Sequence, residues 1–284
     1  MKKYFGVFLL IAFLFGFQTQ SDGQGLNIPA PSPLQKITQN FATSKISIEY
    51  SRPGVKGRSI FGELVPYDSV WRTGANEPTK ITFGEEVQVE GKNVPAGIYA
   101  LYMMPGKEQW TMILSKDTAL WGAFGYKAGN DLMRVQLKPT TLPMSMETMT
   151  FLFSNVKPTA CDVQLLWDKT MVSFHVTTEI DAKIMTQIDQ AMKGEKPPYW
   201  QAANYYFENG KDINKAYEWV NKAIAARPDA YFMMTAKAKM ELKMGKTAEA
   251  ITTAKQAMEL ARKENDNNYI AQNEKIIAEA SAKK

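Results

Sequence analysis

The feature that most constrains the fold is a change in the period of apolar residues near Glu179. Before that point apolar and polar side chains tend to alternate, as they do across residues 45–50. Beyond it apolar residues recur every three or four positions, as Ile180, Ile184 and Ile188 do. A period of two is typical of half-buried strands, and a period near 3.6 is typical of amphipathic helices. The sequence therefore predicts a β domain followed by an all-α domain.

The alternating runs are short and are separated by residues that favour turns. They lie at residues 46–50, 81–83, 87–89, 98–104, 110–114, 149–153, 163–167 and 172–176. Gly91-Lys92-Asn93 predicts a turn, and Asp168-Lys169 predicts a tight hairpin between the last two runs. Because no helical pattern intervenes, a parallel α/β sheet is disfavoured. We expect residues 35–179 to form an all-β sandwich or jelly-roll-like domain of eight or nine strands.

The first 23 residues are typical of a secretory signal peptide. Lys2 and Lys3 precede an apolar run from Tyr4 to Phe17, which is shorter than the ~20 residues that a membrane-spanning helix needs. We therefore expect a periplasmic or secreted protein with no membrane span after cleavage. Residues 24–34 are rich in proline and predict an extended lead-in.

The expected helical domain, residues 180–284, contains a repeat of 34 residues. Aligning 197–230 with 231–264 superimposes Ala216 on Ala250 and Ala223 on Ala257. This spacing of small and aromatic residues is similar to that of tetratricopeptide repeats. A generic array of helical hairpins is the alternative. Residues 266–280 predict a polar capping helix, which terminal repeats need.

Composition excludes several classes of function. The net charge of +5 is spread along the 284 residues without a basic block, which disfavours a nucleic-acid surface. The only cysteine, Cys161, permits no intrachain disulfide, and we interpret it as a small apolar strand residue rather than a nucleophile. The only histidine, His175, excludes a two-histidine metal site. It leaves a Ser-His-Asp arrangement open, although no Gly-x-Ser-x-Gly motif accompanies it. No metal or cofactor is predicted.

Two segments of the β domain, residues 52–78 and 116–130, do not alternate. Long irregular segments in a compact domain are often binding loops. Arginine side chains suit carboxylates, phosphates and sugar hydroxyls, and indole faces suit sugar rings. The candidate ligand-binding residues are Arg52, Lys56, Arg58, Trp71, Arg72, Asn76, Glu77 and Trp121. The alternative is structural: Arg72 and Glu77 would pair with each other and hold the loop in place.

Residues 29–179 resemble a bacterial family known as domain of unknown function 2911. The motifs that carry the resemblance are Ser51-Arg52-Pro53, Lys56-Gly57-Arg58, Ile60-Phe61-Gly62, Leu64-Val65-Pro66-Tyr67, Val70-Trp71-Arg72-Thr73-Gly74-Ala75-Asn76-Glu77, Val94-Pro95-Ala96-Gly97-Ile98-Tyr99 and Trp121-Gly122. The resemblance implies an exported protein, frequent in Bacteroidetes-like bacteria and sometimes extended by helical repeats. It implies no activity.

The helical domain offers a second kind of candidate site. Tyr199, Tyr205 and Tyr206 crowd the first repeat, and those not needed for its core would face a protein partner. We therefore predict an exported binding protein, with a small anionic or glycan-like ligand on the β domain and a protein partner on the helices. One alternative is a periplasmic hydrolase acting on polysaccharide or cell-wall material. Another is a structural interaction module without a ligand.

Overall fold

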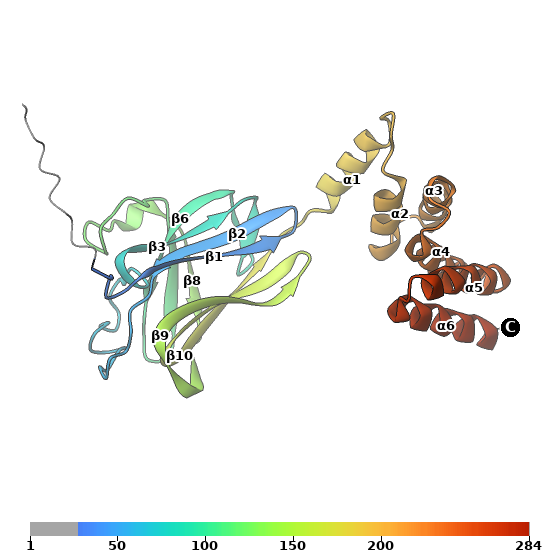
Figure 1. The fold of residues 1–284 in the computed structure, drawn as a ribbon. Coiled ribbons are helices and arrows are strands. Elements are labelled where there is room, and N and C mark those ends of the chain that lie inside the picture. The colour runs from blue at the N-terminus through green and yellow to red at the C-terminus, as the bar shows by residue number, and fades with distance from the viewer. Residues whose placement is uncertain (1–27, 284) are drawn as a thin grey trace, which may run out of the picture. The chain divides into compact units, whose positions relative to one another are not determined.

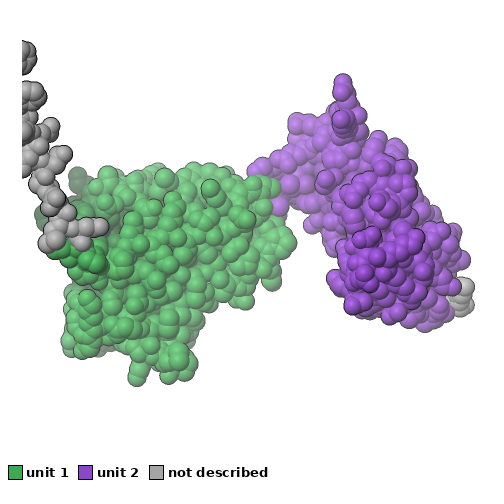
Figure 2. Space-filling model, in the orientation of Figure 1, with its two compact units in different colours: residues 1–178 green, residues 179–284 purple. Residues whose placement is uncertain are grey.

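The computed structural model describes residues 28–283 and confirms the predicted fold class, a β domain followed by an all-α array (Figure 1). The chain divides into two compact units, one ending at Thr178 and the other beginning at Glu179 (Figure 2). The expected signal peptide, residues 1–23, lies outside the described residues. Within residues 28–283 no helix combines the length and the apolar character needed to span a bilayer.

Two antiparallel sheets build the β domain. The six-stranded sheet contains, in spatial order, β1 (Leu34–Phe41), β2 (Ser44–Ser51), β3 (Ala75–Phe83), β6 (Gly97–Met104), β7 (Trp110–Ser115) and β8 (Asp131–Leu137). The four-stranded sheet contains β5 (Lys92–Val94), β4 (Val87–Val89), β10 (Ala160–Thr177) and β9 (Thr140–Lys157). Most neighbours in the sheets are also neighbours in the sequence, but two of these connections are long: residues 52–74 join β2 to β3, and residues 116–130 join β7 to β8.

A single apolar core lies between the two sheets. Alternate residues of each strand point into it, as Ile46, Ile48 and Tyr50 of β2 do. Phe151 of β9 and Leu165 of β10 enter the same core from the other sheet. Each side chain of this kind contributes roughly 1.5–3 kcal/mol when fully buried. The period-two pattern of the sequence is therefore the pattern of burial.

One predicted turn, the hairpin at Asp168-Lys169, is wrong. Asp168 lies inside the continuous strand β10, where the register against β9 shifts on both sides of it. Its φ of 50° and its hydrogen bond from the hydroxyl of Ser145 mark it as a β-bulge, which turn-forming residues also favour. The turn predicted at Gly91-Lys92-Asn93 is confirmed but lies one residue earlier. Glu90 and Gly91 connect β4 to β5, which begins at Lys92.

The irregular segment between β2 and β3 is tied to both sheets. Trp71 exchanges backbone hydrogen bonds with Met103 of β6, with N···O distances of 2.7 and 3.0 Å. Gly54 forms an isolated bridge with Thr148 of β9. Residues 52–74 therefore pass from one sheet to the other. This placement brings polar side chains from the segment to an opening beside the core.

The helical unit contains six helices within the described residues. They are α1 (Asp181–Ala191), α2 (Tyr199–Glu208), α3 (Ile213–Ala226), α4 (Tyr231–Lys243), α5 (Thr247–Lys263) and α6 (Asn267–Ala282). Buried alanines occur at Ala216 in α3 and at Ala250 and Ala257 in α5, so neighbouring helix backbones can approach closely. Gly210 and Gly245 adopt positive φ just after α2 and α4, as the ends of helices favour.

Candidate functional site

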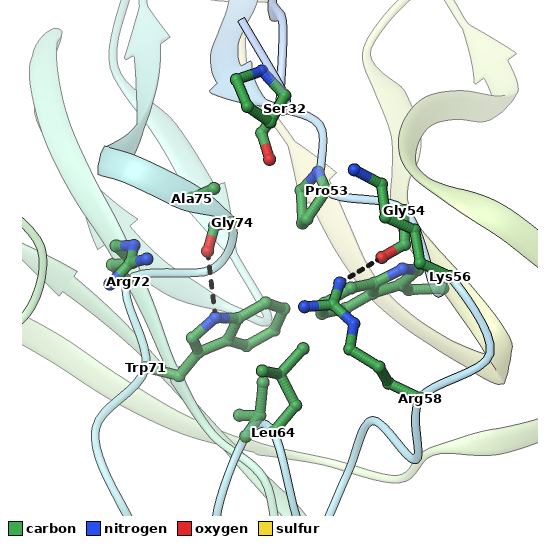
Figure 3. A pocket seen from close by; sticks show the side chains of 13 residues that line it. Ser32, Pro53, Gly54, Lys56, Arg58, Leu64, Trp71, Arg72, Gly74 and Ala75 are labelled. Atoms are coloured by element: carbon green, nitrogen blue, oxygen red, sulfur yellow. Dashed lines mark hydrogen bonds between the residues drawn. The ribbon is translucent and has the colours of Figure 1, made fainter.

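A pocket of about 280 Å³ opens beside the core, where the segment between β2 and β3 folds over it (Figure 3). Lys56, Arg58 and Arg72 supply its charged lining. Apolar contacts come from Pro53, Leu64 and Trp71, among others. The structure thus brings four of the eight candidate ligand residues to one cavity. We refer to it as the cationic pocket.

The charged side chains that line the cationic pocket are all positive, and the nearby carboxylate of Glu147 accepts a hydrogen bond from the backbone nitrogen of Lys56 at 2.9 Å. No aspartate or glutamate is among its lining residues, and none of its three cations forms an ion pair with residues 28–283. Arg58 is held by backbone carbonyls instead. Its Nε donates to the oxygen of Val55 at 3.0 Å, and its Nη2 donates to the oxygen of Gly54 at 2.6 Å (Figure 3). Three like charges around a partly enclosed cavity produce a positive potential that favours an anion.

Arg72 is the least satisfied of the three cations. Its Nε atom is buried and has no hydrogen-bond partner in the described part of the chain. A buried donor without a partner costs about 1–3 kcal/mol, and more when it is charged. The guanidinium lies against the loop at Gly122, where an added Cβ would stand 3.4 Å from Nη1 of Arg72. Gly122 has a φ of 67°, so the loop conformation also favours glycine there.

Trp71 lines the pocket although most of its side chain is buried in the core. Only 8% of its surface is exposed, and its indole nitrogen donates to the oxygen of Gly74 at 3.2 Å (Figure 3). Its ring stacks on the ring of Trp167, which also lines the pocket. Trp71 therefore offers a ligand an edge rather than an open face. Trp167 was not among the residues nominated from the sequence, because its strand pattern marks it only as a core residue.

Asn76, Glu77 and Trp121 lie in a neighbouring depression of about 310 Å³, which we call the aromatic depression. Trp121 is 69% exposed. Glu77 pairs with Lys80 at 2.7 Å, so the expected pair between Arg72 and Glu77 does not form. Seven of the eight candidate residues therefore divide between two cavities of different charge.

Arg52 lines neither cavity. Its Nε donates to the oxygen of Met149 at 3.1 Å, and its Nη2 donates to Oγ1 of Thr150 at 2.8 Å. Both acceptors belong to β9. Arg52 therefore holds the start of the irregular segment against the four-stranded sheet.

The tyrosines nominated in the helical unit mostly make internal contacts. Tyr206 is buried against Trp219, with ring centroids 4.7 Å apart. The hydroxyl of Tyr205 donates to Asp181 of α1, and Lys222 lies over the ring of Tyr199.

A groove of about 530 Å³ in the same unit is lined by other residues. They include Lys239, Lys243, Lys275, Lys283, Phe207 and Ile276. The lysines come from α4 and from α6 with its C-cap. Lys239 and Lys243 are four residues apart in α4 and therefore lie on the same face of the helix. The spacing of the lysines in the sequence could have indicated this groove, whereas a count of charges could not. We refer to this feature as the lysine groove.

The single histidine and the single cysteine lie close to one carboxylate on β10. His175 Nδ1 and Asp162 Oδ1 are 2.6 Å apart, and Asn155 donates to the other oxygen of Asp162 at 2.6 Å. Cys161 is buried in the core. Within residues 28–283 no group of three histidine, cysteine, aspartate or glutamate side chains is placed to hold a metal ion.

The chain is therefore a two-domain protein, with a two-sheet antiparallel β domain that carries a cationic pocket and a second domain of packed helices. The model of the family described as protein of unknown function (DUF2911) matches residues 32–176. Since this match spans just over half of the 284 residues, the chain belongs to the DUF2911 family. A search of the curated proteins found no match. A search of the solved structures found none either.

Proposed function

We propose that the protein is an exported binding protein whose β domain holds a small anionic molecule in the cationic pocket. One observation carries the proposal: Lys56, Arg58 and Arg72 line one cavity that contains no carboxylate. The buried Nε of Arg72 has no partner within the described residues, and a buried donor of this kind is costly unless an acceptor approaches it. A ligand carboxylate, sulfate or phosphate group would supply a negative charge and would accept hydrogen bonds from the guanidinium groups.

The size and the lining of the cationic pocket favour a small ligand with an apolar part. A cavity of about 280 Å³ is close to the lower end of the usual range for ligand pockets, roughly 300–1,000 Å³. Leu64 and Trp71 offer apolar contacts opposite the charged groups. Such a mixture of a few polar groups with apolar walls is typical of sites that fix the orientation of a ligand.

The arrangement supports a hydrolase less well. Glycoside hydrolysis uses two carboxyl groups that face each other across the substrate. The cationic pocket offers none, and the two glutamates of the aromatic depression each have a lysine partner. Glu77 pairs with Lys80 at 2.7 Å, and Glu49 lies 3.7 Å from Lys36.

For the helical unit we propose tetratricopeptide-like repeats that bind a protein partner. The 34-residue spacing of the buried alanines Ala216 and Ala250 supports this assignment. The lysine groove, with its apolar floor at Phe207 and Ile276, is the surface that we assign to the partner. We place the protein in the periplasm or outside the cell, because residues 1–23 have the features of a signal peptide.

Calorimetric titration with phosphate, sulfate, citrate and a set of monocarboxylates tests the proposed anion site. The mature protein should bind at least one of these anions, more weakly as the salt concentration rises. Arg72→Met and Lys56→Ala should each weaken the binding about tenfold or more, which is ~1.4 kcal/mol and within the range of charged hydrogen bonds. Lys45→Ala, an exposed lysine on β2, is the matched control. Equal affinities in all three variants would contradict the proposal.

A further inference from the structure

We infer that the aromatic depression binds a sugar ring, which makes the ligand of this domain a saccharide with an anionic substituent. The anionic part of this inference rests on the proposed function of the cationic pocket. The sugar part rests on separate residues, chiefly Trp121, Asn76 and Glu77. The two parts can therefore fail independently.

Trp121 provides the platform for the ring. Its side chain is 69% exposed, whereas Trp71, Trp110 and Trp167 of the same domain are buried. Large aromatic side chains are usually mostly buried in a core, so an exposed indole face is unusual. The apolar C–H face of a pyranose covers an indole well, while its hydroxyl groups remain free to reach polar neighbours. Trp121 also lines a defined depression, so it is not an isolated surface residue.

The rim of the aromatic depression offers both kinds of hydrogen-bonding group. Glu49 and Glu77 present carboxylate oxygens, Asn76 presents an amide, and Lys80 presents an ammonium group. Sugar hydroxyls both donate and accept, so this mixture matches them better than a set of cations would. Each carboxylate has a lysine partner, Lys80 for Glu77 and Lys36 for Glu49, so the rim has no excess of positive charge that would attract a second anion. We therefore assign the uncharged part of the saccharide to this rim.

The two cavities are neighbours, because three chain segments each contribute residues to both. Pro53 lines the cationic pocket and Ser51 lines the aromatic depression; Ala75 and Asn76 divide in the same way. The lead-in places Ser32 at the first cavity and Leu34 at the second. Two residues of extended chain span roughly 7 Å, which sets the scale of the separation.

Asn76 and Arg72 join the two cavities. The amide of Asn76 donates to Oγ of Ser51 at 3.1 Å and reaches the oxygen of Ser32 at 3.5 Å. Arg72 lines the cationic pocket, while its Nη1 lies against Gly122, the neighbour of Trp121. An anionic group held by Arg72 would thus stand beside a ring that stacks on Trp121.

An array of printed oligosaccharides that includes neutral, carboxylated, sulfated and phosphorylated members tests the inference. The mature full-length protein should retain acidic oligosaccharides above the background of a protein-free control. Trp121→Ala should lower that retention at least tenfold, and Trp121→Phe should restore part of it. Retention of no acidic oligosaccharide would overturn the inference, as would equal retention by Trp121→Ala and the unaltered protein.

Phe124 provides the matched control for the loss of an aromatic side chain. It belongs to the same loop, is 90% exposed and does not line the depression. Phe124→Ala should therefore bind as the unaltered protein does. If Phe124→Ala and Trp121→Ala lose retention equally, the loss reflects general stickiness of the loop, and the inference is wrong.

Sugar-free anions separate the inference from the proposed function. Trp121→Ala should bind phosphate or citrate as tightly as the unaltered protein, because Trp121 does not line the cationic pocket. If sugar-free anions bind but no acidic oligosaccharide is retained, the sugar site is wrong and the anion site stands. If neither binds, both are wrong.

Discussion

The indole rings of Trp71 and Trp167 stack with their centroids 5.8 Å apart and their planes 17° from parallel. Trp71 belongs to the irregular segment after β2, and Trp167 belongs to β10 in the other sheet. Phe61 meets both rings edge-on, with centroid distances of 5.9 and 6.0 Å. The irregular segment is therefore held to the core by an aromatic cluster. This cluster gives the cationic pocket a rigid wall.

We predict that Trp71→Ala destabilises the protein by about 3–5 kcal/mol, the usual cost of removing a large buried aromatic side chain. Trp71→Phe should cost less, because much of the buried area remains. Denaturant titration followed by circular dichroism measures both changes. Trp121→Ala, which removes an exposed indole, is the control and should leave the midpoint unchanged. A loss below 1 kcal/mol for Trp71→Ala would contradict the assignment of Trp71 to the core.

Arg52 should act on stability and not on anion binding. Its guanidinium donates to Met149 and Thr150 of β9 but does not line the cationic pocket. Arg52→Ala should therefore lower the free energy of unfolding by about 1–3 kcal/mol, the range for hydrogen bonds to charged groups. Titration of the folded variant with phosphate should give an unchanged affinity. A weakened affinity with unchanged stability would place Arg52 in the binding site.

The strands that the sequence predicts correctly are those with strongly buried residues, whether these alternate, as in β4, or continue on both faces, as in β6. Val87–Val89 matches β4, and residues 98–104 match β6 to within one residue. The strand β1 was missed because only its last residue, Phe41, is fully buried, so its alternation is weak. The strand β8 carried a usable signal, since Met133, Val135 and Leu137 alternate with polar residues.

The sequence indicates which segment and which types of residue form the candidate site, but it does not predict how those residues are arranged in space. The density of polar residues near aromatics pointed to residues 52–78, and residues of this segment line a cavity in the structure. Trp71 and Arg72 are adjacent in the sequence, yet one enters the core and the other lies against Gly122. Which cavity each residue joins depends on the path of the irregular segments. No local periodicity specifies that path.

Cys161 should be unreactive in the folded protein. Its side chain is fully buried, and burial together with the nearby charge of Asp162 raises the pKa of the thiol to about 11. At pH 8 roughly one thiol in a thousand would be ionised, and the thiolate is the reactive form. Ellman's reagent should therefore label no thiol in the native protein and one after unfolding. Rapid labelling of the native protein would contradict the buried position.

The pair of His175 and Asp162 should contribute to the free energy of unfolding, and that contribution should be lost at strongly acidic pH. Burial disfavours the charged form of Asp162, but hydrogen bonds from Asn155 and His175 outweigh it and hold the pKa of the carboxyl below its ordinary value. A carboxyl with a lowered pKa in the folded state contributes stability above its unfolded pKa, near 3.9. That contribution is lost as the pH falls through the folded pKa.

Asp162→Asn should remove this contribution. The difference in unfolding free energy between the unaltered protein and Asp162→Asn should be present at pH 5 and should shrink as the pH falls below about 4. Denaturant titrations at pH 2.5, 3.5, 5 and 7 measure that difference. Asp68→Asn, which alters an exposed carboxylate in the irregular segment, controls for the general effect of removing a negative charge. A difference that stays constant down to pH 2.5 would show that the carboxylate of Asp162 gains nothing from its partners, because only a carboxyl with a lowered pKa loses stability in that interval.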